Sequence, residues 1–405
     1  MSAIILDGQL KSSLSAVRSL GKAGIPVSVG AVRETGMALH SRYASTRFVY
    51  PSPYIDQEGF IREVKKEAER LGDKPVVYAF SDATYLSLYS HRSDLCEYMT
   101  LIFPDEKSVE IAYDKAATYS LARVSGVPTM STYTPESHEE IVRLSETLSY
   151  PAVLKTRRSV TWKEGVGIFG SATFVQNKEE LQNNFHELKE KLGESPLVQD
   201  FLLGEEYGVE MLAEKGNVYA RVTHHRMRSL SPTGGASVLK ETLREGDLKN
   251  TMEIYAEKLV KVLAWSGPIM VEFKVDSDTR EPKLMEINGR FWGSLPLSVS
   301  AGVDMPYLYY EHAIKNIVPQ NVVTAHEGVT SNHFLGDVMH LVRVLVKIDP
   351  MRKYLYPTRM HAIRDFCILP LGTKADVFSF HDPKPALFEV IDIFNKLWHS
   401  KKRNK

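Results

Sequence analysis

Two segments on either side of residue 280 alternate apolar and polar side chains with a period of two. They read IMVEFKVD (269–276) and KLMEINGR (283–290), and the run SDTRE separates them. Alternation of this kind is typical of β-strands, in which side chains two apart share a face. The pattern predicts a β-hairpin whose inner face includes Val271, Phe273 and, on the second strand, Met285 and Ile287.

The other face of this hairpin carries the charged residues. If SDTRE forms the turn and Asp276 pairs with Pro282, Glu272 lies directly opposite Glu286. Facing carboxylates repel each other, and each raises the pKa of the other unless a cation lies between them. The sequence therefore predicts either a cation at this pair or an ordinary solvated surface.

Two further polar residues, Asn288 and Arg290, continue the charged face of the second strand. Carboxylate and amide oxygens suit Mg²⁺, which also accepts phosphate oxygens and water. A guanidinium suits a phosphoryl group in transfer. Glu272, Glu286 and Asn288 are therefore candidate metal ligands, and Arg290 is a candidate catalytic residue.

The composition limits the class of protein. Lys and Arg together number 50 and are balanced by 50 Asp and Glu, so no net field favours nucleic acid. The two cysteines form no C-x-x-C pair, and no run of 18 apolar residues indicates a membrane-spanning helix. The N-terminal apolar run, residues 3–6, is too short for a signal peptide. We expect a cytoplasmic enzyme with reduced cysteines.

The first 113 residues alternate apolar strands with amphipathic helices. Expected strands are AIIL (3–6), PVSVGAV (26–32) and PVVYAF (75–80), and expected helices cover residues 9–23 and 60–72. Repeats of this length predict a doubly wound parallel sheet. The first turn, DGQ, is not G-x-G-x-x-G, so the dinucleotide-binding fingerprint is missing.

After residue 113 the pattern becomes α+β. YPAVLKT (150–156) and GSATFVQN (170–177) are expected to pair as antiparallel strands, and further strands are expected within 195–227. Residues 326–405 are mixed, with helices expected near 336–347 and 385–398. The expected domains are 1–113, 114–195, 196–325 and a C-terminal mixed α/β extension, 326–405.

A basic, glycine-containing loop follows the strand that ends at Lys155. It reads TRRSVTWKEGVGIFGS and contains Gly165 and Gly167. Glycines let backbone amides approach phosphate oxygens, and such a loop can act as a mobile lid. A surface turn is the simpler interpretation, just as Lys115 taken alone is a solvated lysine.

A third candidate region is LVQDFLLGEEYGVEML (197–212). The backbone of an edge segment containing Gln199, Asp200, Phe201 and Leu202 could bond an adenine, and Glu206 could accept hydrogen bonds from ribose hydroxyls. Taken alone, these residues are a strand and a turn.

A second substrate is expected near THHRMRSLSPTGG (223–235). Arg226 could bind a carboxylate, and His225 could remove a proton from an amine. An ordinary strand-to-loop transition is the alternative.

In this order, the motifs resemble the ATP-grasp superfamily. They are YDKAATYSLARVSGVP, PAVLKTRR, the glycine loop, VQDFLLGEEYGVEM, IMVEFKVD and KLMEINGRFWGS, and they cover roughly residues 1–315. The resemblance is to the carboxylate–amine ligase branch, and it implies a pre-ATP-grasp α/β domain followed by a two-subdomain ATP-grasp fold.

The resemblance also implies roles for individual residues. Lys115 and Lys155 would contact ATP phosphates, Gln199 and Leu202 would border the base, and Glu206 would hold the ribose. Glu272, Glu286 and Asn288 would bind two Mg²⁺ ions, with Mn²⁺ as a substitute, and Arg290 would steady the γ-phosphate or an acyl phosphate. Gly289 stands where many relatives have proline, and the loop lacks a compact G-G-x-G run.

The implied function is an ADP-forming ligase that joins a small-molecule carboxylate to an amine through an acyl phosphate. Relatives often form homodimers. The alternatives are an ATP-grasp small-molecule kinase and a nucleotide-binding regulatory protein without catalysis.

Overall fold

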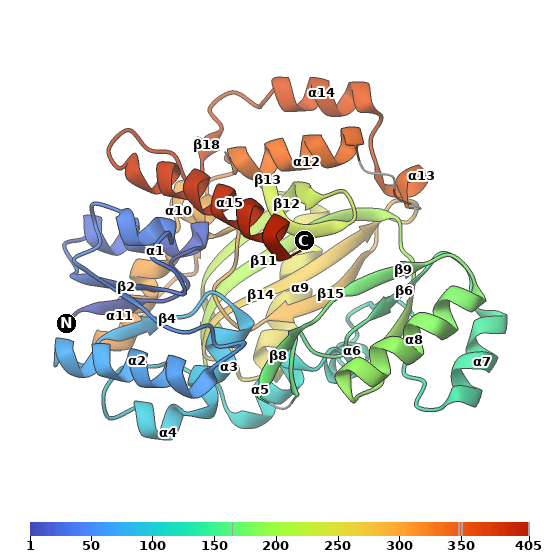
Figure 1. Ribbon diagram of the computed structural model, residues 1–405, viewed down its shortest axis with the longest axis horizontal. Helices are drawn as coiled ribbons and strands as arrows, with labels where there is room; N and C mark the ends of the chain where they lie inside the picture. Colours follow the sequence, from blue (N-terminus) through green and yellow to red (C-terminus); the bar gives the residue numbers. More distant parts are fainter. Residues whose placement is uncertain (164, 347–348, 350, 404–405) are drawn as a thin grey trace.

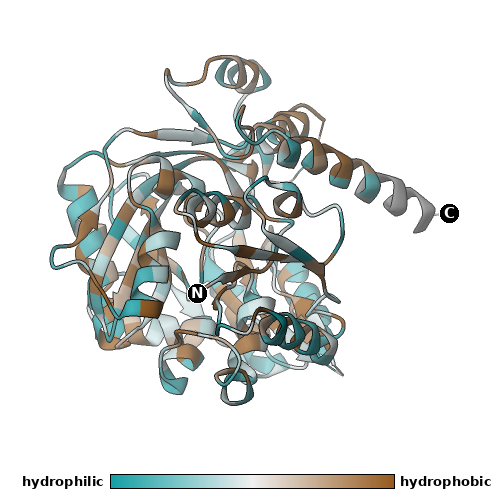
Figure 2. Cartoon of the chain, turned by 90° about the vertical axis from the view of Figure 1, so that its left-hand side faces the viewer, coloured by the Kyte–Doolittle hydropathy of each residue, from teal (hydrophilic) through white to brown (hydrophobic). Residues whose placement is uncertain are grey.

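The computed structural model describes residues 1–163, 165–346, 349 and 351–403, which form three sheets, a small hairpin and surrounding helices (Figure 1). Hydrophobic residues, brown in Figure 2, lie mainly on the strands in the middle of the molecule, and hydrophilic residues lie mainly on the outer helices. Among the helices of these residues, none is both long and apolar enough to cross a membrane.

The N-terminal sheet is parallel, as its alternating strands and helices predicted. Its order is β3-β2-β1-β4. The strands are β1 (Ala3–Ile5), β2 (Val27–Ala31), β3 (Thr46–Val49) and β4 (Val76–Tyr78). The accompanying helices are α1 (Lys11–Lys22), η1 (Met37–His40), α2 (Gln57–Leu71), α3 (Asp82–Ser90) and α4 (Arg92–Leu95). Helix α1 packs on one face and α2 on the other, so the sheet is doubly wound.

The edge strand β3 was missed by the sequence prediction. Its residues are exposed or half-buried, whereas those of β1, β2 and β4 are buried throughout. An edge strand lacks the continuous apolar run by which a buried parallel strand is recognised.

The second sheet has the order β5-β10-β6-β9, and its pairs are antiparallel. The strands are β5 (Thr132–Tyr133), β6 (Ala152–Lys155), β9 (Ala172–Val175) and β10 (Leu197–Asp200). The predicted pairing of the strands near residues 152 and 175 is confirmed. Helices α7 (His138–Thr147) and α8 (Lys178–Leu192) cover this sheet, and β7 (Val160–Lys163) and β8 (Val166–Phe169) form a separate hairpin.

The third sheet is the largest, with eight strands, and it runs through the centre of the molecule (Figure 1). Its main path is β15-β14-β11-β12-β13-β17-β18, and β16 pairs with β12. The strands are β11 (Gly204–Glu214), β12 (Asn217–Ser231), β13 (Gly234–Thr242), β14 (Gly267–Asp276), β15 (Pro282–Asn288), β16 (Val323–Thr324), β17 (Thr330–Asn332) and β18 (Lys374–Ala375).

The remaining helices connect these sheets. They are α5 (Glu106–Tyr113), α6 (Lys115–Val124), α9 (Asp247–Val262), α10 (Leu295–Ser300), α11 (Met305–Lys315), α12 (Phe334–Val346), α13 (Arg352–Leu355), α14 (Arg359–Cys367) and α15 (Lys384–Arg403). Helices α12 and α15 confirm the two helices that were expected in the C-terminal segment.

A β-bulge corrects the predicted register of the hairpin β14–β15. Val275, not Asp276, pairs with Pro282, and the register shifts beyond Phe273 so that Glu272 still lies opposite Glu286. The extra residue in β15 is Met285. Because a bulge re-aims a side chain, Leu284 is the fully buried partner of Phe273, and the half-buried Met285 faces a cavity, not the core as expected.

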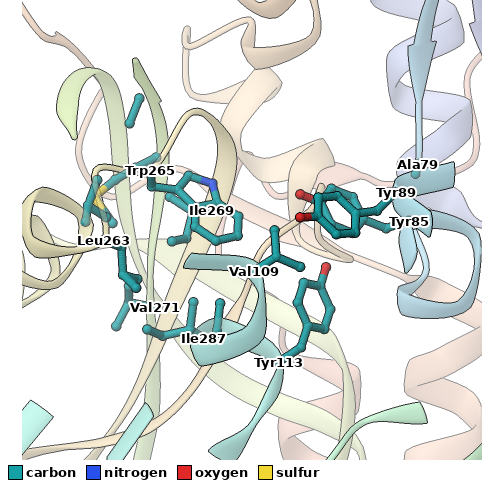
Figure 3. Close-up of a cluster of buried hydrophobic side chains, with 14 of the residues drawn as sticks. Ala79, Tyr85, Tyr89, Val109, Tyr113, Leu263, Trp265, Ile269, Val271 and Ile287 are labelled. Carbon is teal, nitrogen blue, oxygen red and sulfur yellow. The ribbon is translucent and has the colours of Figure 1, made fainter. Parts of the chain in front are cut away.

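One hydrophobic core joins the N-terminal sheet to the central sheet (Figure 3). Tyr85 of α3 and Tyr113 of α5 stack with ring centroids 5.5 Å apart. Val109 lies between these rings and the cluster around Trp265 and Ile269. This packing holds the carboxyl ends of β1 and β4 beside β14 and β15.

Candidate active site

A cavity of about 1420 Å³ lies where the three sheets and the C-terminal helices meet. Typical small-molecule sites measure roughly 300–1,000 Å³, so this cavity has room for a nucleotide and a second molecule. Thirteen of the fifteen predicted site residues line this cavity, and the other two are Gly165 and Gly167.

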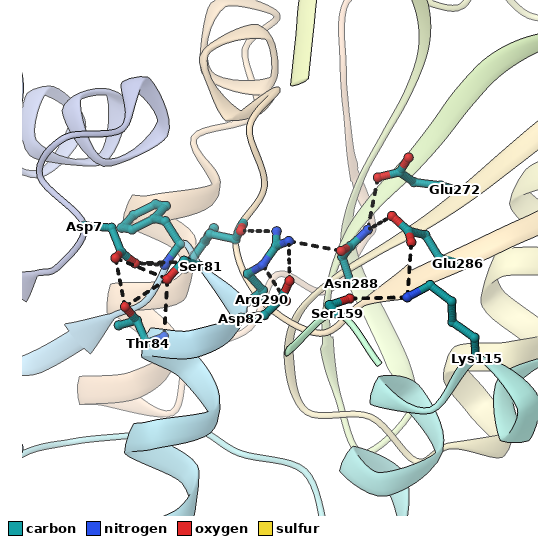
Figure 4. A network of polar contacts seen from close by, with 12 residues as sticks. Asp7, Ser81, Asp82, Thr84, Lys115, Ser159, Glu272, Glu286, Asn288 and Arg290 are labelled. Atoms are coloured by element: carbon teal, nitrogen blue, oxygen red, sulfur yellow. Dashed lines mark hydrogen bonds and ion pairs between the residues drawn. The ribbon is translucent and has the colours of Figure 1, made fainter. Parts of the chain in front are cut away.

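The acidic pair lies in one wall of this cavity. Glu272 and Glu286 face each other across β14 and β15, and the amide Nδ2 of Asn288 donates to Glu272 (3.0 Å) and to Glu286 (3.4 Å) (Figure 4). A donor that bridges two carboxylates occupies the place where a cation would bind. The three side chains are thus close enough to act as one set of ligands.

These residues fit Mg²⁺ when a nucleotide supplies further oxygens. Asn288 Oδ1 accepts from Arg290 (3.1 Å), so the amide must turn its oxygen to the acids to act as a ligand. In the described part of the chain, no group of three or more His, Cys, Asp or Glu could hold a metal alone. This donor set therefore suits an ion shared with phosphates.

The two acids have different electrostatic surroundings. Burial raises the pKa of Glu272, although Arg226 opposes this shift. Burial also acts to raise the pKa of Glu286, but the charges of Lys115 and Lys155 outweigh it and lower the pKa. In the absence of a cation, a proton bound by the pair therefore resides on Glu272 rather than on Glu286.

Arg226 lies inside the acidic cluster rather than apart from it. Its guanidinium donates to Glu206 (2.9 Å) and to Glu272 (2.8 Å), because β12 pairs with β11 so that Arg226 lies opposite Glu206. The arginine therefore neutralises the proposed ribose-binding and metal-binding acids. It is not placed at a separate carboxylate site.

His225 is the predicted catalytic residue that the geometry separates from this cluster. It precedes Arg226 on β12, so its side chain points to the other face of the sheet. There it stacks on Tyr207 with ring centroids 4.6 Å apart and lies 3.9 Å from Glu205. His225 nevertheless lines the cavity, so its expected role as a proton acceptor stays a prediction, separate from the contacts of Arg226.

Two lysines reach the acidic pair from the second sheet and its first helix. Lys115 Nζ lies 3.9 Å from Glu286 and 3.5 Å from Ser159 Oγ (Figure 4). Burial lowers the pKa of Lys155 at the end of β6, and the charges of Glu286 and Glu206 oppose that shift. Both ammonium groups are thus placed to meet an anion between them and the acids.

The glycine loop lies farther away than expected. The Gly167 amide donates to the Tyr54 carbonyl oxygen (2.7 Å), and a Cβ at Gly167 would lie 2.9 Å from the Tyr54 ring. Gly165, with φ +78°, lies at the hairpin turn. Phe169 and Gly170, rather than these two glycines, line the cavity. The backbone amide of Gly167 is therefore hydrogen-bonded to the N-terminal domain and not directed at the cavity.

The expected adenine-binding edge is also corrected. β10 is an inner strand, since Gln199 pairs with Val153 on one side and Thr132 on the other. Gln199 is buried and donates to Thr132 Oγ1 (2.9 Å). Asp200 ends the strand, and its amide donates to the Ser131 carbonyl oxygen. The backbone available to a base therefore begins only after Asp200.

Phe201 and Leu202 line the cavity just beyond this strand. The Phe201 ring lies 5.9 Å from that of Phe174 and 5.8 Å from that of Tyr354. This apolar wall suits a flat ring, and its Tyr354 comes from the C-terminal helices.

Two residues of the site were missed by sequence reasoning. Asp82 accepts from Arg290 through both oxygens, at 2.9 and 3.2 Å, and so orients the guanidinium beside Asn288 (Figure 4). Lys274 lies opposite Glu206 on β14 and lines the cavity. Asp82 could have been predicted because it follows the carboxyl end of a parallel strand, where ligands bind. Lys274 could have been predicted because it lies two residues after Glu272 and so shares its face of the strand.

Comparisons with known proteins agree on the fold. A profile of the family described as "ATP-grasp in the biosynthetic pathway with Ter operon" matches residues 194–334. The carbamoyl phosphate synthase large chain of Pyrococcus furiosus is 27% identical over 204 residues. That match covers 49% of this chain and 18% of the relative, so the chain corresponds to less than a fifth of that protein.

Solved structures with low sequence identity share the fold. The biotin carboxylase domain of Hydrogenobacter thermophilus 2-oxoglutarate carboxylase, a dimer with MgADP and bicarbonate, has a TM-score of 0.63 at 16% identity and covers 81% of this chain and 73% of that chain. Staphylococcus aureus N5-carboxyaminoimidazole synthetase with ADP has a TM-score of 0.59 at 18% identity, with 81% of each chain covered. Residues 194–334 thus match an ATP-grasp family, the solved structures share the mixed α/β fold of this chain, and the relatives named here support a resemblance to the carboxylate–amine ligase branch.

Proposed function

We propose that this protein is an ATP- and Mg²⁺-dependent ligase that joins a carboxylate to an amine and releases ADP and phosphate. The observation that carries the proposal is the single wall formed by Glu272, Glu286 and Asn288, with Arg290 on one side and Lys115 on the other. Cations and acids in this arrangement suit transfer of a phosphoryl group.

In this proposal Glu272, Glu286 and Asn288 hold Mg²⁺, which would neutralise charge on the ATP phosphates. Lys115 and Lys155 bind phosphate oxygens from the opposite side. Arg290, oriented by Asp82, steadies the phosphoryl group as it moves. Two ions, and Mn²⁺ as a substitute, belong to the same proposal. The similar structures determined with MgADP or ADP support the choice of nucleotide and ion.

The remaining nucleotide contacts follow from the walls of the cavity. Phe201 and Leu202, with the apolar ring of Phe174, bound the space for the base. Glu206 would accept hydrogen bonds from ribose hydroxyls after it releases Arg226. Gly165 and Gly167 do not line this space, whereas Gln199 and Asp200 do, at the end of β10.

The reaction follows from the weakness of a carboxylate as an electrophile. Transfer of the γ-phosphoryl group to a carboxylate oxygen releases ADP and gives an acyl phosphate. The amine nitrogen then attacks the acyl carbon, a proton leaves the nitrogen, and inorganic phosphate departs. Positioning and charge neutralisation are the main tasks of the protein, and closure of the β7–β8 hairpin would exclude water.

We also propose that residues 1–113 form a pre-ATP-grasp domain, 114–195 and 196–325 the two ATP-grasp subdomains, and 326–405 an extension. The exposed free thiols of Cys96 and Cys367 suit the reducing cytoplasm. A homodimer is a further proposal, supported by the dimer of the similar biotin carboxylase domain.

A screen of acid–amine pairs for ADP release, with mass spectrometry of products, tests the function. A ligase needs an acid and an amine together for sustained turnover. A stable phosphate ester on a hydroxyl product would indicate the kinase instead, and ATP binding without turnover on any pair would indicate the regulatory protein.

A further inference from the structure

A buried cluster of charges adjoins the wall of the same cavity at Lys11 and Ser237. Asp376 Oδ2 accepts from Lys11 (2.6 Å) and from Lys240 (2.5 Å), and Lys11 also donates to the Ser237 carbonyl oxygen (2.8 Å). The three charged residues come from α1, β13 and the segment after β18, which the fold brings together. None of them has a place in the proposed transfer of phosphate.

With both lysines protonated, this cluster carries one net positive charge, although Asp376 Oδ1 has no hydrogen-bond partner among the described residues. Two lysines share one carboxylate, and all three side chains are at least nine-tenths buried. Burial is the main cause that lowers the pKa of Lys240 to about 7, and the nearby Lys11 ammonium adds to it, while Asp376 opposes the shift. An anionic group here would be attracted by the lysine ammonium groups, and this attraction is stronger in a buried place than in water and offsets the cost of removing the anion from water.

Several hydrogen-bond donors at this place lack partners. Ser237 is 5% exposed, and within the described residues its Oγ has no hydrogen-bond partner. Lys11 uses two of its three N–H groups in the bonds given above. Helix α1 begins at Lys11 after Leu10, which provides no side-chain cap, so the first amides of this helix and its dipole are available to an anion.

The same groups line the cavity. Lys11, Ser12 and Ser237 form part of its wall together with Asn288 and Arg290. α1 follows β1, so its first turn lies at the carboxyl edge of the parallel sheet, where open α/β sheets bind ligands. A molecule in contact with Arg290 could therefore extend to this cluster without leaving the cavity.

We propose that Lys11, Ser237 and the first turn of α1 bind an anionic group, a carboxylate or a phosphate, on the second substrate. The inference deepens the proposed function, since it adds a negative group to a substrate that also carries the reacting acid or amine. Lys240 and Asp376 position Lys11 and do not touch the ligand. This subsite is separate from the ATP phosphates, which lie between Lys115, Lys155 and the acidic pair in our proposal.

Calorimetry on the full chain tests this subsite. The protein is first saturated with Mg²⁺ and a non-hydrolysable ATP analogue, which fills the positions of all three nucleotide phosphates. Inorganic phosphate and malonate are then titrated separately, and these two arms distinguish a phosphate from a carboxylate. We expect saturable binding of at least one anion to the wild type.

Three variants complete the experiment. We expect Lys11→Met to weaken anion binding about tenfold and Ser237→Ala about threefold, because each removes a donor. Lys22→Met, an exposed lysine at the other end of α1, should bind like the wild type. Ser237→Ala removes a hydroxyl that has no partner in the described chain, so it should keep the thermal stability of the wild type and remain informative if Lys11→Met is unstable.

The inference is overturned if neither anion binds saturably to the wild type, or if Lys11→Met and Ser237→Ala both bind with unchanged affinity. Failure of the ATP analogue to bind in the first step would instead contradict the proposed function. The anion titrations, repeated without nucleotide, would then still decide the role of Lys11 and Ser237.

Discussion

Glu272 and Glu286 lie directly opposite each other on β14 and β15, and their pKa values shift in opposite directions. Burial dominates for Glu272, whereas two lysines outweigh burial for Glu286. Because Glu272 holds a proton more tightly than Glu286, a cation that displaces Arg226 and the proton on Glu272 would bind with a dependence on pH. This pair is the centre of the proposed site, and the first prediction tests it.

We expect Glu286→Gln to lower the rate of ATP turnover at least 100-fold, because the amide cannot neutralise a cation shared with the phosphates. Steady-state ADP release at saturating Mg²⁺ measures this loss. Glu281→Gln is a matched control, since Glu281 is exposed at the turn of the same hairpin. Turnover by the Glu286→Gln protein at the wild-type rate would show that the metal assignment is wrong.

We expect Lys155→Met to weaken binding of an ATP analogue about tenfold or more, which corresponds to roughly 1.4 kcal/mol of binding free energy. The reason is the loss of a half-buried ammonium whose charge interacts with the acidic pair. Calorimetry provides the affinity, and Lys178→Met on the exposed start of α8 is the control. Equal affinities of the two variants would remove Lys155 from the nucleotide site.

The bulge in β15 predicts opposite effects of two neighbouring substitutions. Leu284→Ala should lower the free energy of unfolding by roughly 2–5 kcal/mol, because the Leu284 side chain is fully buried. Met285→Ala should cost less stability but weaken binding of an ATP analogue severalfold, because Met285 lines the cavity. Denaturant unfolding and calorimetry measure the two effects. Without the bulge, Met285 would face the core, and Met285→Ala would cost more stability than Leu284→Ala. That result would contradict the register described here.

Glu210 predicts a dependence of stability on pH. Burial raises the pKa of Glu210 to about 7, although hydrogen bonds from Ser294 and Ser298 oppose this shift. The folded protein thus binds more protons than the unfolded chain between pH values of about 4.5 and about 7. The raised pKa of Glu210 therefore contributes about 3 kcal/mol to the free energy of unfolding below that pH range. This contribution is lost as the pH rises through the range.

Glu210→Gln should remove this dependence, because an amide remains neutral throughout. Urea unfolding at several pH values between 5 and about 8 provides the slope for each protein. Glu190→Gln, at an exposed position of α8, is a control that should keep the wild-type slope. Parallel curves for the wild type and Glu210→Gln would show that Glu210 titrates normally.

Much of the site follows from local patterns in the sequence. Alternation along residues 269–290 predicted that Glu272 faces Glu286, with Asn288 and Arg290 on the same side, and the repeated strands and helices of the first 113 residues predicted a parallel sheet. Side-chain direction in a strand without a bulge depends on whether the position is odd or even. This information is contained in a few neighbouring residues.

The remaining features depend on contacts between distant parts of the chain. Arg290 is oriented by Asp82, more than 200 positions earlier, and Lys11 meets Lys240 through Asp376. The bulge at Met285 and the use of the Gly167 amide by Tyr54 are likewise results of packing.

The sequence by itself determined the strand pattern, the order of the motifs and the facing acids, because these follow from the short-range geometry of the backbone. Only the tertiary structure decided which cation pairs with which acid, which face His225 occupies and how the C-terminal helices close the cavity. The physical reason is that burial and charge pairing depend on distances in space, which a linear sequence does not contain.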